Sequence, residues 1–207
     1  MGNNKDIISG VEKYYSEKVK AFGANAKGVD WNSEESQNIR FVQLLKLINT
    51  EGNFSVLDYG CGYGTMFGFM KSLFPQFKYT GFDISVDMLK EAQALYVTDN
   101  NAEWMQELGS DIYDYSIASG IFNVKQQHGA EEWKVYIEET LQEINKVSGK
   151  GFAFNMLTSY SDTPFMKDYL YYADPCYFFD YCKRNFSKNV ALLHDYELYE
   201  FCILVKK

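Results

Sequence analysis

The chain has 207 residues, a net charge of −8 at pH 7 and no dense block of lysine or arginine. Nucleic acids and anionic membrane surfaces are bound through positive patches, so neither is an expected partner. The length predicts a single α/β domain with modest additions. No apolar run approaches the roughly 18 residues that a membrane-spanning helix needs.

The four cysteines are scattered, and no two of them form a C-x-x-C pair. This spacing predicts neither a zinc site nor a dithiol redox motif, and no metal is expected. The first residues lack the apolar segment of a secretion signal. We therefore expect a cytoplasmic protein with free thiols, since disulfides are rare in that compartment.

Residues 1–52 are predicted to form a helical extension. Apolar residues recur at helical spacing over 5–22, and a loop rich in Gly, Ala and Asn follows. Asn32 is predicted to cap a second helix, with Glu35 as its capping-box partner. Beside the apolar stripes stand polar and aromatic residues that are candidates for covering a ligand site: Tyr14, Tyr15, Trp31, Gln37 and Arg40.

Residues 53–157 alternate between short apolar runs and amphipathic stretches. The predicted strands are 55–59, 79–82, 102–106, 113–119 and 152–157. The predicted helices are 65–73, 86–97 with Ser85 as its cap, and 131–147, which the stretch 148–151 ends. Such alternation is typical of a mostly parallel sheet with helices on both faces.

The rest of the chain departs from this alternation. Residues 158–189 form a tyrosine-rich segment and a helix that Asp174 and Pro175 open and that runs to about Asn185. Asn155, Tyr160 and the cluster at 169–172 are expected in a substrate lid, or else in a small aromatic core. Residues 190–207 hold two β-rich runs, 190–196 and 198–206, whose short separation predicts an antiparallel hairpin. The predicted fold is α/β, a Rossmann-like seven-stranded sheet closed by that hairpin.

The first strand leads into an acid and three alternating glycines: Asp58, Gly60, Gly62 and Gly64. Asp83 stands at the end of the next apolar run. This layout predicts a nucleotide-type cofactor site at the carboxyl end of a parallel sheet. A dinucleotide fingerprint would place glycine where Thr65 stands, and the Gly-Lys-Ser/Thr of a phosphate-binding loop is absent.

From Ser55 to its end, the chain resembles the class I S-adenosylmethionine-dependent methyltransferases. The motif Asp58-x-Gly60-Cys61-Gly62-x-Gly64 resembles the acidic Gly-x-Gly-x-Gly loop of that family. The resemblance implies S-adenosylmethionine as the cofactor, with Asp58 near its ammonium group and the glycines close to its methionine part and ribose. It also implies that Asp83 binds both ribose hydroxyls, although Asp83 could instead cap the following helix.

Other cofactor contacts are implied with alternatives left open. Ile84 and Met88 would flank the adenine or belong to the core. The residue that reads the adenine amino group would follow the third strand, where Gln106, Ser110 and Asp111 qualify and Asp111 is preferred. The backbone of Ser119 and Gly120 would pass the methionine end, Arg40 could meet the cofactor carboxylate, and Trp31 could cover the site.

We therefore predict a methyltransferase that acts on a hydroxyl or amine of a small molecule. His128 and His194, the two histidines of the chain, are candidates for a general base, although each could be structural. An NAD-dependent oxidoreductase and a cofactor-binding protein without catalysis are the alternatives. The sequence leaves the oligomeric state open, a homodimer included.

Overall fold

The computed structural model describes residues 3–23, 33–49 and 52–207. Seven strands form one sheet in the order β3-β2-β1-β4-β5-β7-β6. Strands β1 to β5 run parallel, and β7 is antiparallel to both β5 and β6. The predicted sheet and its terminal hairpin are confirmed. The strands are β1 (Ser55–Tyr59), β2 (Lys78–Phe82), β3 (Ala102–Met105), β4 (Tyr113–Ala118), β5 (Ser148–Leu157), β6 (Asn189–Leu193) and β7 (Glu200–Lys206).

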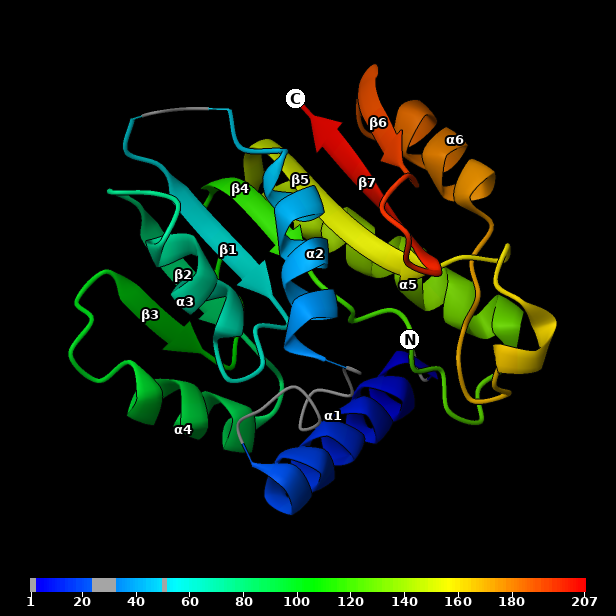
Figure 1. Cartoon of the computed structure of the whole chain (residues 1–207), viewed down its shortest axis with the longest axis horizontal. Helices are drawn as coiled ribbons and strands as arrows, with labels where there is room; N and C mark the ends of the chain where they lie inside the picture. The colour runs from blue at the N-terminus through cyan, green and yellow to red at the C-terminus, as the bar shows by residue number, and fades with distance from the viewer. Residues whose placement is uncertain (1–2, 24–32, 50–51) are drawn as a thin grey trace.

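Helices cover both faces of the sheet, because neighbouring residues of a strand point to opposite sides. On β4, β5 and β7, Ile117, Ala153 and Leu204 pack toward α2 and α3, whereas Ala118 and Phe154 pack toward α5 and α6. Figure 1 shows α2 and α3 in front of the sheet and α5 behind it. The helices are α1 (Asn3–Phe22), α2 (Glu34–Leu45), α3 (Thr65–Lys71), α4 (Val86–Leu95), α5 (Ala130–Val147) and α6 (Pro175–Asn185).

Several predicted boundaries are wrong: the first hairpin strand ends at Leu193 and not at Tyr196, and two further boundaries differ for reasons that the contacts show. The cap of α2 is Ser33 and not Asn32, because the Ser33 hydroxyl accepts the N–H of Ser36 at 3.1 Å; Asn32 itself lies outside the described residues. Strand β5 begins at Ser148 and not at Phe152, because Ser148 and Gly151 pair with β4 on one side and Gly151 also pairs with β7 on the other. The predicted caps Ser85 and Asp174 are confirmed.

Helix α1 runs across the edge of the sheet at which the parallel strands end (Figure 1). It is held against the start of α4 by the hydroxyls of Ser16 and Ser85, 2.8 Å apart, and by an ion pair of 2.8 Å between Lys20 and Asp87. Its far end is tied by Gln126, whose amide donates to the carbonyl oxygen of Gly10 at 2.9 Å. The extension therefore forms a cover over the carboxyl edge. In the described part of the chain, no helix is long and apolar enough to cross a membrane.

Candidate functional site

A cavity of about 270 Å³ lies at the carboxyl ends of β1, β2 and β4, under α1. Parallel α/β sheets place their ligand sites at this edge. Nine of the predicted site residues line this cavity: Asp58, Gly60, Cys61, Gly62, Asp83, Ile84, Met88, Ser119 and Gly120. Helices α1 and α2 contribute the opposite wall with Ile8, Val11, Tyr15, Gln37 and Phe41.

The glycine turn after β1 depends on glycine for two reasons. Gly60, Gly62 and Gly64 have φ angles of 79°, 54° and 84°, in the left-handed region that other residues rarely adopt. A Cβ atom on Gly60 would also lie 2.3 Å from Cγ2 of Ile121. The turn is tied to β2, since the N–H of Gly60 donates to the carbonyl oxygen of Phe82 at 2.7 Å. The backbone is thereby exposed to the cavity without side chains in the way.

Asp83 follows β2, and its carboxylate is hydrogen-bonded both to the loop after β1 and to the loop after β2. Its Oδ2 accepts the N–H of Gly62 and its Oδ1 accepts the N–H of Ser85, each at 2.8 Å. Each carboxylate oxygen can accept a further hydrogen bond. Burial raises the pKa of Asp83 to about 6, although these two N–H groups work in the opposite direction. Ser85 is the N-cap of α4, so the alternative in which Asp83 caps this helix is wrong.

Asp58 is 2% exposed and faces the cavity from the end of β1. Burial raises its pKa to about 7, the hydrogen bond from Tyr79 lowers it, and the nearby Asp83 raises it. The Cys61 thiol between the two acids has a pKa raised by burial. A cation bound near Asp58 would favour its charged form, because an opposite charge within about 4–6 Å stabilises a carboxylate.

A second cavity of about 330 Å³ adjoins the first, and Tyr15 and Gly120 line both. The tyrosine-rich segment after β5 and the start of β7 form much of its wall. Its aromatic lining is Tyr15, Phe165, Tyr169, Tyr172 and Tyr199. Its charged lining residues are Arg40, Lys167, Glu197 and Glu200. Tyr169 and Tyr172, two of the residues predicted for the lid, thus line the second cavity.

Three of the predicted cofactor contacts do not line the first cavity. Gly64 caps α3 and packs against the ring of Trp104. Arg40 lies in the second cavity and donates from Nε and Nη2 to the carboxylate of Glu200, each at 2.7 Å. Asp111 is exposed and lines neither of these two cavities. Trp31 lies outside the described residues.

Neither histidine lines either of these two cavities. His128 Nδ1 lies 3.5 Å from the carboxylate of Glu132, and its ring stacks against Trp133 at 6.2 Å between centroids. The ring of His194 packs against Tyr160 and Phe201. Neither histidine therefore lies at the wall that the two cavities share at Gly120, and the role of a general base stays a prediction for both.

Several lining residues were missed by the sequence reasoning. Helix α5 contributes Tyr136, Glu139, Thr140 and Glu143 to the first cavity, and Tyr59 lies beside them. The Tyr59 hydroxyl donates to Glu143 at 3.3 Å. Their spacing on α5 is the i, i+3, i+4, i+7 pattern of one helical face, next to the buried apolar stripe. That second, partly polar stripe was the signal available in the sequence.

Comparisons with known proteins show the family to which the chain belongs. The family profile described as a methyltransferase domain matches residues 56–151. Rv1506c of Mycobacterium tuberculosis, which is named as a methyltransferase, is 48% identical over 164 residues, 79% of this chain and 99% of its own length.

Two solved structures share the fold at low sequence identity. Magnesium protoporphyrin IX methyltransferase of Synechocystis, with S-adenosylhomocysteine bound, has a TM-score of 0.67 at 16% identity, over 96% of this chain and 99% of its own. The complex of DhpI with S-adenosylhomocysteine has a TM-score of 0.68 at 11% identity, over 97% and 96%. With its strand order, its acidic glycine turn and these relatives, the chain belongs to the class I S-adenosylmethionine-dependent methyltransferases.

Proposed function

We propose that the protein transfers a methyl group from S-adenosylmethionine in the first cavity to a hydroxyl or amine of a small molecule in the second. The observation that carries this proposal is the shared wall of the two cavities at Gly120 and Tyr15. Methyl transfer requires donor and acceptor to meet in line, so positioning supplies much of the rate.

The first cavity fits the adenosine half of the cofactor. Asp83 keeps acceptor capacity on both carboxylate oxygens after its two backbone hydrogen bonds, which suits a pair of ribose hydroxyls. Ile84 and Met88 line the same cavity and offer apolar surface for the adenine. Met88 also packs against Val19 and Tyr63, so both the cofactor and the core readings of this residue have support.

The other end of the cavity fits the methionine half. The Asp58 carboxyl faces the cavity and suits an ammonium group. The buried Oγ of Ser119 has no hydrogen-bond partner within the described residues, and Ser119 lines the same wall. A buried hydroxyl without a partner is costly, which points to a ligand group there. When bound, the cofactor supplies a methyl group on a sulfonium, an electrophile with a good leaving group.

The second cavity supports a small, partly ring-shaped acceptor. Tyrosine side chains offer both a flat apolar face and a hydroxyl, which suits rings that carry polar substituents. Residues 158–189 contribute Ser161, Phe165, Lys167, Tyr169 and Tyr172 to its wall, and we propose this segment as the substrate lid. The net charge of −8 supports a small molecule over a nucleic acid as partner.

The test is transfer of tritium from methyl-labelled S-adenosylmethionine to a panel of small hydroxyl and amine compounds. For a compound that is methylated, Tyr169→Ala should raise KM at least fivefold and leave the dissociation constant of S-adenosylhomocysteine unchanged, because Tyr169 lines only the second cavity. The matched control is Tyr160→Ala: this exposed tyrosine was also expected in the lid, but it lines neither cavity. Equal effects of the two substitutions on KM would reject the acceptor site.

A further inference from the structure

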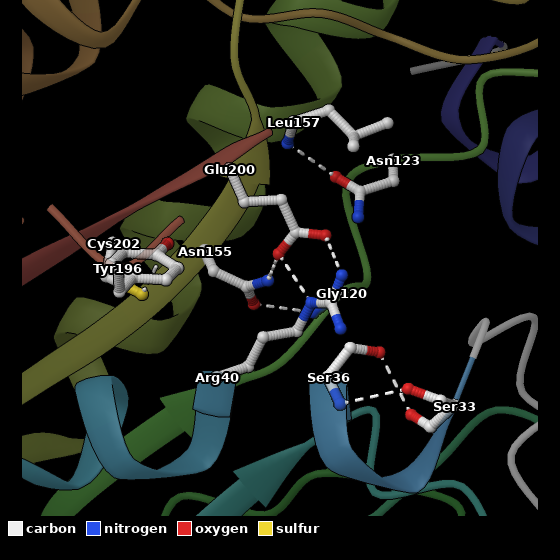
Figure 2. A network of polar contacts seen from close by, with 10 residues as sticks. All are labelled: Ser33, Ser36, Arg40, Gly120, Asn123, Asn155, Leu157, Tyr196, Glu200 and Cys202. Carbon is white, nitrogen blue, oxygen red and sulfur yellow. Dashed lines mark hydrogen bonds and ion pairs between the residues drawn. The ribbon is translucent and has the colours of Figure 1, made fainter. Parts of the chain in front are cut away.

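A chain of buried polar contacts links the second cavity to the loop after β4. Glu200, 1% exposed at the start of β7, receives both Arg40 hydrogen bonds. The same carboxylate accepts the Asn155 Nδ2 at 2.6 Å, and Asn155 Oδ1 accepts the N–H of Gly120 at 2.8 Å. Figure 2 shows the four residues in this order, drawn from α2, β7, β5 and the loop.

The contacts fix the orientation of the Asn155 side chain. An amide has one accepting and one donating end, and a carboxylate can only accept. Glu200 therefore holds the Nδ2 group, which leaves Oδ1 facing the N–H of Gly120. Asn155 is completely buried, so water cannot replace either partner. The ion pair with Arg40 in turn gives the buried Glu200 carboxylate a counter-charge.

The chain of polar contacts ends at the backbone of Gly120. Its φ angle is 76°, and it lines both cavities. Glu200 and Arg40 line the second cavity and not the first. Residues of the second cavity are thus connected, through Asn155, to the backbone that forms the wall of the first.

We infer that Asn155, oriented by Glu200 and Arg40, is a positioning residue that holds the Gly120 backbone between methyl donor and acceptor. The inference rests on the proposed function in one respect, the assignment of the second cavity to the acceptor. It predicts that Glu200, which does not line the first cavity, affects cofactor binding only through Asn155.

A double-mutant cycle read by calorimetric titration of S-adenosylhomocysteine tests this coupling. Glu200→Gln and Asn155→Ala should each weaken binding about fivefold, and the double variant should bind no more weakly than Asn155→Ala, since coupled residues are not additive. The control is Ser116→Ala, which removes a buried 2.7 Å hydrogen bond between β4 and β5 away from the cavities. It should lower stability and leave the affinity unchanged.

Additive losses, or full affinity in both single variants, would overturn the inference. If the variants do not fold, hydrogen exchange of the wild type decides: the Gly120 amide should be protected to the level of the β4 amides, and rapid exchange would overturn the inference. These measurements need only S-adenosylhomocysteine. A failure to find any methylated small molecule would therefore reject the acceptor assignment separately.

Discussion

Tyr79 donates a hydrogen bond of 2.5 Å to Oδ2 of Asp58, and the two residues come from neighbouring parallel strands. Both side chains are buried, and Asp58 lines the first cavity. Tyr79 therefore holds the acid of the glycine motif from behind, and the other carboxylate oxygen remains for a ligand.

Replacing this tyrosine tests its support of Asp58. Tyr79→Phe should lower the free energy of unfolding by about 1–3 kcal/mol, because a buried acceptor loses its donor. It should also raise the pKa of Asp58 further, since the Tyr79 hydrogen bond now lowers it. Urea denaturation measures the first effect. Tyr115→Phe, in a buried tyrosine of β4 that packs against Phe54, is the control and should have the smaller effect.

The pH dependence of stability tests the raised pKa values of Asp58 and Asp83. Both acids bind a proton more tightly in the folded than in the unfolded chain, because burial raises their pKa values to about 7 and about 6. Their contribution to stability is therefore present at low pH and is lost as the pH rises through 6 and 7. Asp58→Asn should flatten the stability profile of the ligand-free protein between about pH 4, the ordinary pKa of an aspartate, and about pH 7. A profile identical to that of the wild type would contradict the assignment.

The role of Asp83 is tested by cofactor affinity. Asp83→Ala should weaken the binding of S-adenosylhomocysteine at least tenfold, because a ribose-binding carboxylate is removed. Asp111→Asn is the matched control and should change affinity less than twofold, since Asp111 is exposed and lines neither cavity. Calorimetric titration measures both. The reverse ranking would show that the adenine-reading role preferred from the sequence was right and the ribose role wrong.

The need for glycine in the turn after β1 is tested by a substitution whose effect a second substitution should partly relieve. Gly60→Ala should destabilise the protein, by about 1–2 kcal/mol from the left-handed backbone alone, and further through the collision with Ile121. Adding Ile121→Ala should relieve the collision and leave the backbone strain. Gly109→Ala, where a Cβ atom would meet nothing within 4 Å, should be neutral. Thermal denaturation of the three variants measures these effects, and a Gly60→Ala protein as stable as the wild type would contradict the geometry.

Local features of this protein were readable from its sequence. The turn from Asp58 to Gly64 and the acid Asp83 form a pattern of short range, because each follows its own strand and parallel strands end at one edge. The cap at Ser33 was missed by one residue, since Asn and Ser are both good caps and only the hydrogen bond to Ser36 separates them.

Contacts between distant residues were not readable in the same way. Arg40 and Glu200 are separated by 160 positions, and nothing near Arg40 distinguishes a cofactor ligand from half of an ion pair. The start of β5 at Ser148 depends on pairing with β4, which the flanking glycines concealed. The two histidines were candidates because imidazole can act as a base. Their positions depend on packing that the sequence does not reveal, of His128 against Trp133 and of His194 against Phe201.

A crystal structure with S-adenosylhomocysteine is the sharpest test of the proposed cofactor site. We expect the ribose hydroxyls on Asp83, the amino group beside Asp58 and the sulfur facing the second cavity past Gly120. A well-folded protein that leaves the first cavity empty at millimolar ligand, or a ligand bound with its sulfur turned away from Gly120, would show that the proposed site is wrong.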